Sequence, residues 1–217
     1  MAERETRTEA SRLTARGMVT RDRILRAAAD LMHVKGVAAT TLDHVRAASA
    51  TSKSQLYRHF PDKELLVSQV IELQATELIE RQRQQLERLN SLRGLERWRD
   101  ALVQRNALRG GAYGCPLGSL ASELVDGDDE VRLAFAGHFG EWLGLLVRGL
   151  TRMRDSGTLR PDADPDKLAT SLMAALQGGY LLAQTSRDVT PMKVALDMAI
   201  DHVKLYAVKS RSGESVL

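Results

Sequence analysis

The chain of 217 residues is 43% hydrophobic but only 4% aromatic, contains one cysteine and carries a net charge of +3. Its length suits one large domain or two small ones, and its many Ala and Leu residues favour helices over a sheet. The single cysteine excludes an intrachain disulfide and a multi-cysteine zinc site. No apolar run approaches the roughly 18 residues of a membrane span, and the N-terminus lacks the apolar core of a signal peptide. We therefore expect a cytoplasmic protein.

The positive charge lies mostly in the first third of the chain. Residues 1–63 contain 12 Lys and Arg against 7 Asp and Glu, and the remainder contains 19 against 21. This asymmetry is typical of a DNA-binding head on a separate body, although a chance excess of a few charges gives the same numbers. Residues 1–19 are polar and rich in arginine, and we expect a flexible basic arm that either touches DNA or is an inert tail.

Two helices and a tight turn are predicted next. The first helix begins at Thr20, a capping residue, and ends at Gly36, which accepts a left-handed backbone. The second is capped by Thr40, with Asp43 reaching back in a capping box. The small residues 49–51 then form a turn between this helix and the next.

A third short helix begins at Ser52, and the spacing to Gln55 again matches a capping box. Only Leu56 and Phe60 face inward, so the rest of its surface is polar. A short, capped helix with a polar outer face after a tight turn is what a helix-turn-helix places in the major groove of DNA. Pro61 stops it, and the next helix runs over residues 63–90.

The remaining sequence alternates helical segments with Gly or Pro breaks. The expected helices span 94–109, 117–124, 130–156, 164–186 and 191–208, with a glycine-rich break at 110–116 and an acidic turn at 126–129. We therefore predict an all-α protein with three parts: a flexible arm over 1–19, a three-helix helix-turn-helix head over 20–66, and a multi-helix ligand-binding and dimerisation domain over 67–217.

One run of residues resembles the signature of the tetracycline-repressor (TetR) family. The run is Leu56-Tyr57-Arg58-His59-Phe60-Pro61-Asp62-Lys63-Glu64-Leu65-Leu66, with Thr40-Thr41 and the small turn at the expected distances before it. Residues 114–124 also resemble a segment found in one branch of the family. The chain departs from the family pattern at Ala50 and Ser54, where glycines are usual. Ala50 tolerates a left-handed turn less well than glycine, which predicts a turn that is either slightly strained or differently shaped.

The resemblance implies roles for the polar residues of the head. Those expected to contact phosphates are Thr41, Tyr57, His59 and Lys63, and those expected to contact base edges are Lys53, Ser54 and Gln55. Gln55 has an alternative role, which is to cap the backbone of Ser52. Ser52 is itself a structural cap as well as a candidate phosphate donor, and Arg58 is either a solvated charge or a further phosphate contact.

An effector pocket is expected among the long helices, because small-molecule sites combine apolar walls with a few polar groups. The candidates are Trp98, Tyr113, Cys115, Phe139, Trp142, Met173 and Gln177. Each taken singly is also a reasonable core residue. Cys115 in particular is either a redox or electrophile sensor or a small buried hydrophobe, and we favour the second.

The last two helices are predicted to form a homodimer, since specificity normally needs two heads on two half-sites. The expected interface residues recur at helical spacings and are Leu168, Leu172, Ala175, Leu176, Gly179, Met198, Ile200 and Val203. The alternative is that both helices bury these residues within one chain's own bundle.

The sequence thus predicts a DNA-binding regulator, most simply a repressor released from a palindromic operator by a small molecule, although activation stays open. We expect no cofactor and no metal. The first competing class is an enzyme, but the sequence shows no convincing nucleophile–base pair: Cys115 has no histidine near it in sequence, although His138 could approach it in space. The second is a helical adaptor with a vestigial helix-turn-helix, against which Tyr57, His59 and Lys63 argue.

Overall fold

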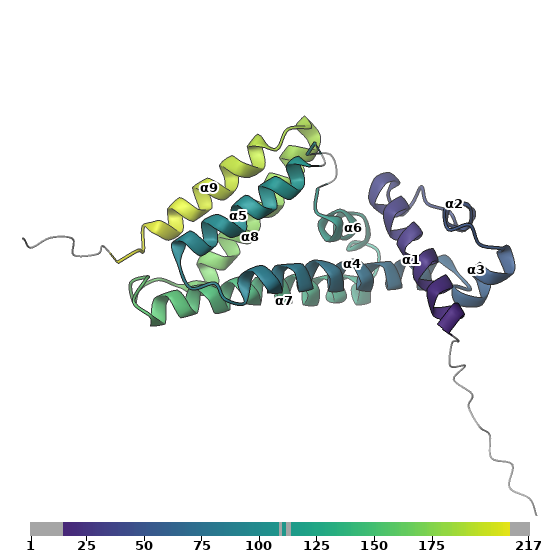
Figure 1. Cartoon of the computed structure of the whole chain (residues 1–217), viewed down its shortest axis with the longest axis horizontal. Helices are drawn as coiled ribbons and strands as arrows, with labels where there is room; N and C mark the ends of the chain where they lie inside the picture. Colours follow the sequence, from purple (N-terminus) through teal and green to yellow (C-terminus); the bar gives the residue numbers. More distant parts are fainter. Residues whose placement is uncertain (1–14, 109, 112–113, 209–217) are drawn as a thin grey trace, which may run out of the picture. The chain divides into compact units, whose positions relative to one another are not determined.

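The computed structural model describes residues 15–108, 110–111 and 114–208, and these residues form nine α-helices. They divide into two compact units, residues 1–70 and 71–217, which we call the head and the body. The boundary lies within one continuous helix, α4 (Lys63–Leu86). Figure 1 shows the helices in chain order. The prediction of an all-α chain with a helix-turn-helix head is confirmed.

The head consists of α1 (Ala15–Lys35), α2 (Leu42–Ala48), α3 (Lys53–His59) and the first turns of α4. Its core is made by side chains at most 1% exposed, which come from α1, α2, α3 with its C-cap, and α4: Ile24, Ala28, Val45, Leu56, Phe60, Leu66 and Val70. Seven-residue helices are too short to be stable alone. Packing and caps therefore hold α2 and α3 in place.

Two predicted helix starts are wrong. Helix α1 begins at least as early as Ala15, and the hydroxyl of Thr20 donates to Arg16 within the helix instead of capping it. The C-terminal part of the predicted arm is therefore helical, and residues 1–14 lie outside the described residues. Helix α2 is capped by Thr41, because Thr40 is buried and donates its hydroxyl to the carbonyl of Gly36.

The turn between α2 and α3 is a Schellman motif with alanine at the glycine position. Thr51 N donates to Arg46 O, Ala50 N donates to Ala47 O, and Ala50 has φ of +48°. The expected strain at Ala50 is confirmed, because a left-handed residue with a Cβ costs about 1–2 kcal/mol. The buried hydroxyls of Ser49 and Thr51 lie 2.8 Å apart and close the turn from inside.

Replacing Ala50 with glycine should raise the free energy of unfolding of the head by about 0.5–1 kcal/mol, the net of relieved strain and glycine's entropy in the unfolded chain. The same change at Ala47, an exposed helical position in α2, is the matched control and should lower it by about 0.5–1 kcal/mol. Urea denaturation measures both. An Ala50→Gly variant no more stable than the parent would contradict this account.

The body is built from the rest of α4 with α5 (Leu92–Ala107), α6 (Pro116–Leu124), α7 (Asp129–Asp155), α8 (Pro165–Ser186) and α9 (Thr190–Lys204). Most predicted bounds are correct within two residues. Helices α4 and α9 each end four residues earlier than predicted, at Leu86 and Lys204. Two tryptophans, Trp98 of α5 and Trp142 of α7, are fully buried in the core.

Helices α8 and α9 pack in very close contact. Gly179 of α8 has no side chain, and a Cβ placed there would lie 2.8 Å from the Cα of Met192 in α9. Glycine is therefore needed at this crossing, because a larger residue would push against backbone. Ion pairs join other helices of the body, with Arg83 of α4 binding Glu141 of α7 at 2.7 Å and Lys204 binding Glu96 of α5 at 3.1 Å.

Candidate DNA-binding surface and ligand pocket

The capping box of α3 engages two of the predicted DNA-contacting residues. The hydroxyl of Ser52 accepts a hydrogen bond from the backbone of Gln55 at 3.2 Å, and the Gln55 carboxamide oxygen accepts one from Ser52 N at 2.9 Å. The prediction that Ser52 caps this helix is confirmed. The carboxamide oxygen that Gln55 would need to pair with adenine is occupied, which favours its alternative role as a cap.

The outer face of α3 carries four exposed polar side chains, Lys53, Ser54, Tyr57 and Arg58. They fall at spacings of one and four residues, so they share one side of the helix. The Lys53 ammonium lies 5.9 Å from the Tyr57 ring centroid, within cation–π range. These side chains are exposed to solvent, so packing of the head does not explain why they gather on this face.

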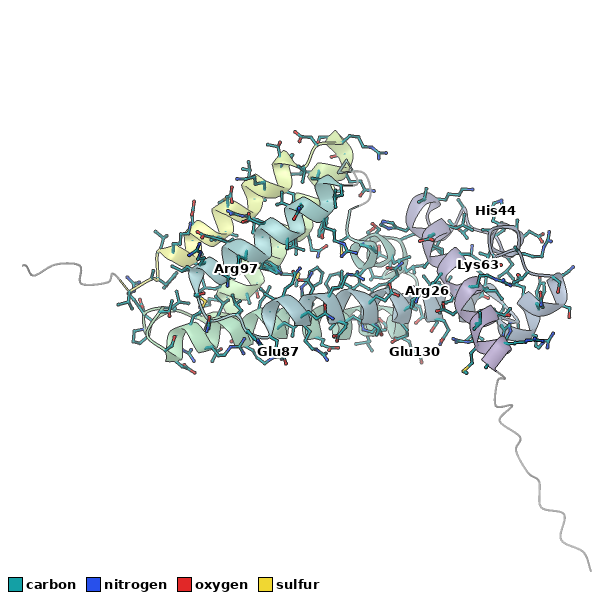
Figure 2. The ribbon with its side chains drawn as sticks, in the orientation of Figure 1. Arg26, His44, Lys63, Glu87, Arg97 and Glu130 are labelled. Carbon is teal, nitrogen blue, oxygen red and sulfur yellow. The ribbon has the colours of Figure 1, made fainter. Side chains whose placement is uncertain are left out.

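Three further predicted contacts surround this helix. Thr41 is exposed at the start of α2, where its hydroxyl accepts from His44 N at 3.2 Å. His59 ends α3, and Lys63 begins α4 with its ammonium 3.4 Å from the carbonyl of Ala38. His44 and Lys63 are labelled in Figure 2. Sequence reasoning missed His44, whose ring completes the Thr41 capping box.

The local charges of the head are positive at the end of α3. Desolvation, together with the nearby charges of Arg58 and Arg21, lowers the pKa of His59 below its ordinary value. Arg21 also donates to Gln69 at 2.7 Å and lies over the Phe60 ring. Its guanidinium thus ties α1 to the residues that follow α3. Sequence reasoning missed this tie, because the two partners are 48 residues apart.

The body contains a hollow of about 310 Å³ between α6, α7 and α8, which we call the α6–α8 pocket. Its lining includes two predicted residues from α7 and α8, Phe139 and Gln177, and Cys115 at the start of α6. The residues that sequence reasoning did not single out are, apart from Leu181, small or polar: Gly114, Gly118, Ser119, Ala121, Ser122 and Gln184. Tyr180 completes the wall.

Cys115 is buried and caps α6 with its sulfur. The thiol accepts a hydrogen bond from Gly118 N at 3.3 Å. Burial raises the pKa of this thiol above its ordinary value, and hydrogen bonds from Gly118 and Gln177 offset only part of that shift. The thiol is therefore neutral at neutral pH. This supports the small buried hydrophobe over the reactive sensor, because the thiolate is the reactive form.

The remaining predicted pocket residues do not line this hollow. Trp98 is buried elsewhere, with its indole donating to Gln82 at 2.8 Å. Trp142 is fully buried behind Phe139, on which its ring stacks at 6.4 Å between centroids. Met173 touches the pocket only through Gln177, whose amide lies 3.7 Å from its sulfur. Tyr113 lies outside the described residues.

Most of the predicted dimer residues are buried inside the chain itself. These are Leu168, Leu172, Leu176, Gly179, Ile200 and Val203, which form the α8–α9 contact and the core beneath it. Assigning them to an interface with a second chain was therefore wrong. Met198 is 66% exposed and Ala175 is half-buried, so both remain accessible.

None of the described helices is long and apolar enough to cross a membrane. In the same part of the chain, no three His, Cys, Asp or Glu side chains gather as metal ligands would.

A three-helix head with a polar-faced third helix, joined to a separate helical body, defines a helix-turn-helix DNA-binding regulator. Comparison with family models gives the particular family. The model described as "Bacterial regulatory proteins, tetR family" matches residues 24–70. The model described as "Tetracyclin repressor-like, C-terminal domain" matches residues 85–199. The chain belongs to the TetR family of transcriptional regulators, which bind DNA.

Individual relatives agree with the family models. The HTH-type transcriptional repressor DhaR of Mycobacterium sp. (strain GP1) is 26% identical over 183 residues, covering 83% of this chain and 90% of DhaR. The LmrA regulator of Bacillus subtilis is 26% identical over 179 residues, covering 80% and 90%. A TetR transcriptional regulator of Chloroflexus aurantiacus superposes with a TM-score of 0.79 at 25% identity, over 89% of this chain and 98% of that one.

Proposed function

We propose that this regulator is a homodimeric repressor that binds a palindromic operator and is released when a small molecule enters the α6–α8 pocket. The exposed polar face of α3 is the observation that supports it most directly. Repression is favoured over activation because the relative DhaR is described as a repressor. A protein of this kind acts on the chromosome, and we therefore also propose a cytoplasmic location.

Within the head, the proposed contacts follow exposure and chemistry. Lys53 and Ser54 are exposed at the start of α3, where a recognition helix contacts base edges. Tyr57, His59 and Lys63, with Thr41 of α2, are proposed to bind phosphates. Arg58 is exposed beside Tyr57, and we assign it to a phosphate as well.

Selection from random duplex DNA tests this function. The protein should enrich a palindrome whose half-sites lie about one helical turn apart, or a multiple of it. A gel shift with the selected site at rising salt should then show specific, salt-sensitive binding. Enrichment of no sequence, or of a single unrepeated half-site, would contradict the proposal.

The proposed dimer uses the outer faces of α8 and α9. The exposed large apolar side chains there are Leu181, Leu182, Val194 and Met198, each more than half exposed. Small residues Ala174 and Gly178 of α8 share the exposed side with Leu181 and would permit close approach of a second helix. Exposed apolar patches of this kind mark interaction surfaces.

Replacing Met198 with glutamate should convert the dimer into a monomer at micromolar concentration. In a twofold interface the change occurs twice, so a cost of about 2 kcal/mol per copy raises the dissociation constant roughly a thousandfold. Sedimentation equilibrium measures this. Leu133→Glu, at an exposed apolar position of α7, is the matched control and should stay dimeric. The proposed face is wrong if Met198→Glu and Leu182→Glu both remain dimers.

A further inference from the structure

Two glutamines of α8 lie against two glycines near the start of α6. A Cβ at Gly114 would lie 2.8 Å from the carboxamide oxygen of Gln184, and one at Gly118 would lie 2.8 Å from that of Gln177. Glycine at both positions therefore leaves room for the carboxamides. The two glutamines are seven residues apart, which is roughly 10 Å along the helix axis at 1.5 Å per residue. They place one polar group towards each end of the α6–α8 pocket.

Both carboxamides keep hydrogen-bonding capacity for a ligand. Each offers two donor hydrogens and an acceptor oxygen. The amide nitrogen of Gln177 is within 3.7 Å of the Met173 sulfur, which is a weak acceptor, and the same side chain hydrogen-bonds the Cys115 thiol, so its carboxamide oxygen is the atom left for a ligand. No hydrogen bond engages the side chain of Gln184 within the described part of the chain.

The residues between these polar ends are apolar or aromatic. Leu181 lies on α8 between the two glutamines, and Phe139 and Tyr180 complete the wall. Phe139 is held nearly parallel to Trp142, with 13° between the ring planes. A flat apolar segment of a ligand fits such a surface, because aromatic rings prefer offset stacking.

Among the described residues that line the pocket, none carries a charge. Arg81 of α4 acts on the Cys115 thiol only from a distance, and its guanidinium lies 3.9 Å from the Glu77 carboxylate. An ionised ligand would lose its hydration here without gaining an opposite charge, which is unfavourable.

We infer that the α6–α8 pocket selects an uncharged, elongated aromatic molecule with a hydrogen-bonding group at each end, bound by Gln177 and Gln184. This inference rests on the proposed effector function and adds the chemical class of the effector. A hollow of about 310 Å³ is at the small end of the range for ligand sites, which favours a molecule of about two rings.

Isothermal titration of the full-length protein with two probes built on the same biphenyl core tests the inference. The first is 4,4′-dihydroxybiphenyl, which is uncharged at pH 7 with a hydroxyl at each end, and the second is biphenyl-4,4′-dicarboxylate. The uncharged probe should bind one per protomer, at least tenfold more tightly than the dianion. Gln177→Leu and Gln184→Leu should each weaken it roughly five- to tenfold, the loss of one neutral hydrogen bond.

Gln104→Leu, at an exposed position of α5, is the matched control and should bind both probes as the parent does. Circular dichroism confirms that each variant is folded, and Gln177→Met replaces Gln177→Leu if the latter does not fold. The inference is overturned if the uncharged probe shows no saturable binding, if the dianion binds as tightly, or if both glutamine variants bind like the parent.

Operator binding measured with the same probes separates the two proposals. If the uncharged probe binds selectively but leaves operator affinity unchanged, the inferred ligand class is supported. The proposal that a ligand in this pocket releases the operator is then contradicted. If the dianion binds and releases the operator, effector release stands and the ligand class fails. Linkage requires that a releasing ligand and the operator weaken each other's binding by the same factor.

Discussion

Replacing Lys53 with alanine should weaken operator binding by about 2–6 kcal/mol and relax the preference for one base pair in each half-site. The estimate takes about 1–3 kcal/mol for each base contact and counts it once per protomer. Lys53 is exposed in the first turn of α3, and among the described residues of the head its side chain contacts only the Tyr57 ring. The loss should therefore come from DNA and not from folding. Competition gel shifts against single-base variants of the operator measure it.

Lys63→Ala provides the contrast. A phosphate contact carries no sequence information, so this variant should bind all sequences more weakly, with an unchanged order of preference and a salt slope lower by about 2 for the dimer. Arg105→Ala removes the same charge from an exposed position of α5 and should change neither affinity nor slope. The assignment of Lys53 to a base fails if its variant behaves like Lys63→Ala.

Replacing Gly179 with leucine should destabilise the body by about 3 kcal/mol or more, the upper part of the range for overpacking. The first atom of the new side chain would meet the backbone of α9 at Met192, 2.8 Å away, and backbone cannot rotate aside as a side chain can. Urea denaturation at one fixed protein concentration measures the change, because dimer stability depends on concentration.

Gly137→Leu is the matched control for this prediction. Gly137 lies in α7, is exposed, and a Cβ there would meet nothing within 4 Å. Leucine is the better helix former, so this variant should be more stable by about 0.5–1 kcal/mol. If the two substitutions change stability equally, close α8–α9 contact is not the reason for glycine at 179.

The head could be predicted in detail because its signals are local. The Ser52–Gln55 spacing, Pro61 and the two apolar residues of α3 fix that helix within a few neighbouring positions. The start of α2 shows the limit of such signals. Thr40 and Thr41 are both good caps, and the choice between them depends on the burial of Thr40, which only the folded head determines.

The body could be predicted only as a set of helices. Helices α8 and α9 are apolar over much of their circumference, so periodicity could not tell the face that packs inward from the face left exposed. The lining of the pocket could not be predicted for a different reason. Size and aromaticity pointed to Trp98 and Trp142, which are core residues, whereas most of the residues that line the hollow are small or polar. A signal did exist in Gln177 and Gln184 seven residues apart, matched by Gly114 and Gly118.

The division of the chain within α4 has a consequence for recombining this regulator with its relatives. The head ends at Val70 and the body begins at Ile71, and both lie in one unbroken helix, so no loop is available as a splice site. Each helical residue turns about 100°. A chimaera joining this head to a foreign body must therefore preserve the residue count of α4, since one inserted residue moves every later side chain to another side of the helix. The position of a gene fusion within α4 is therefore constrained by helical phase. A flexible linker between the two units would not impose this constraint.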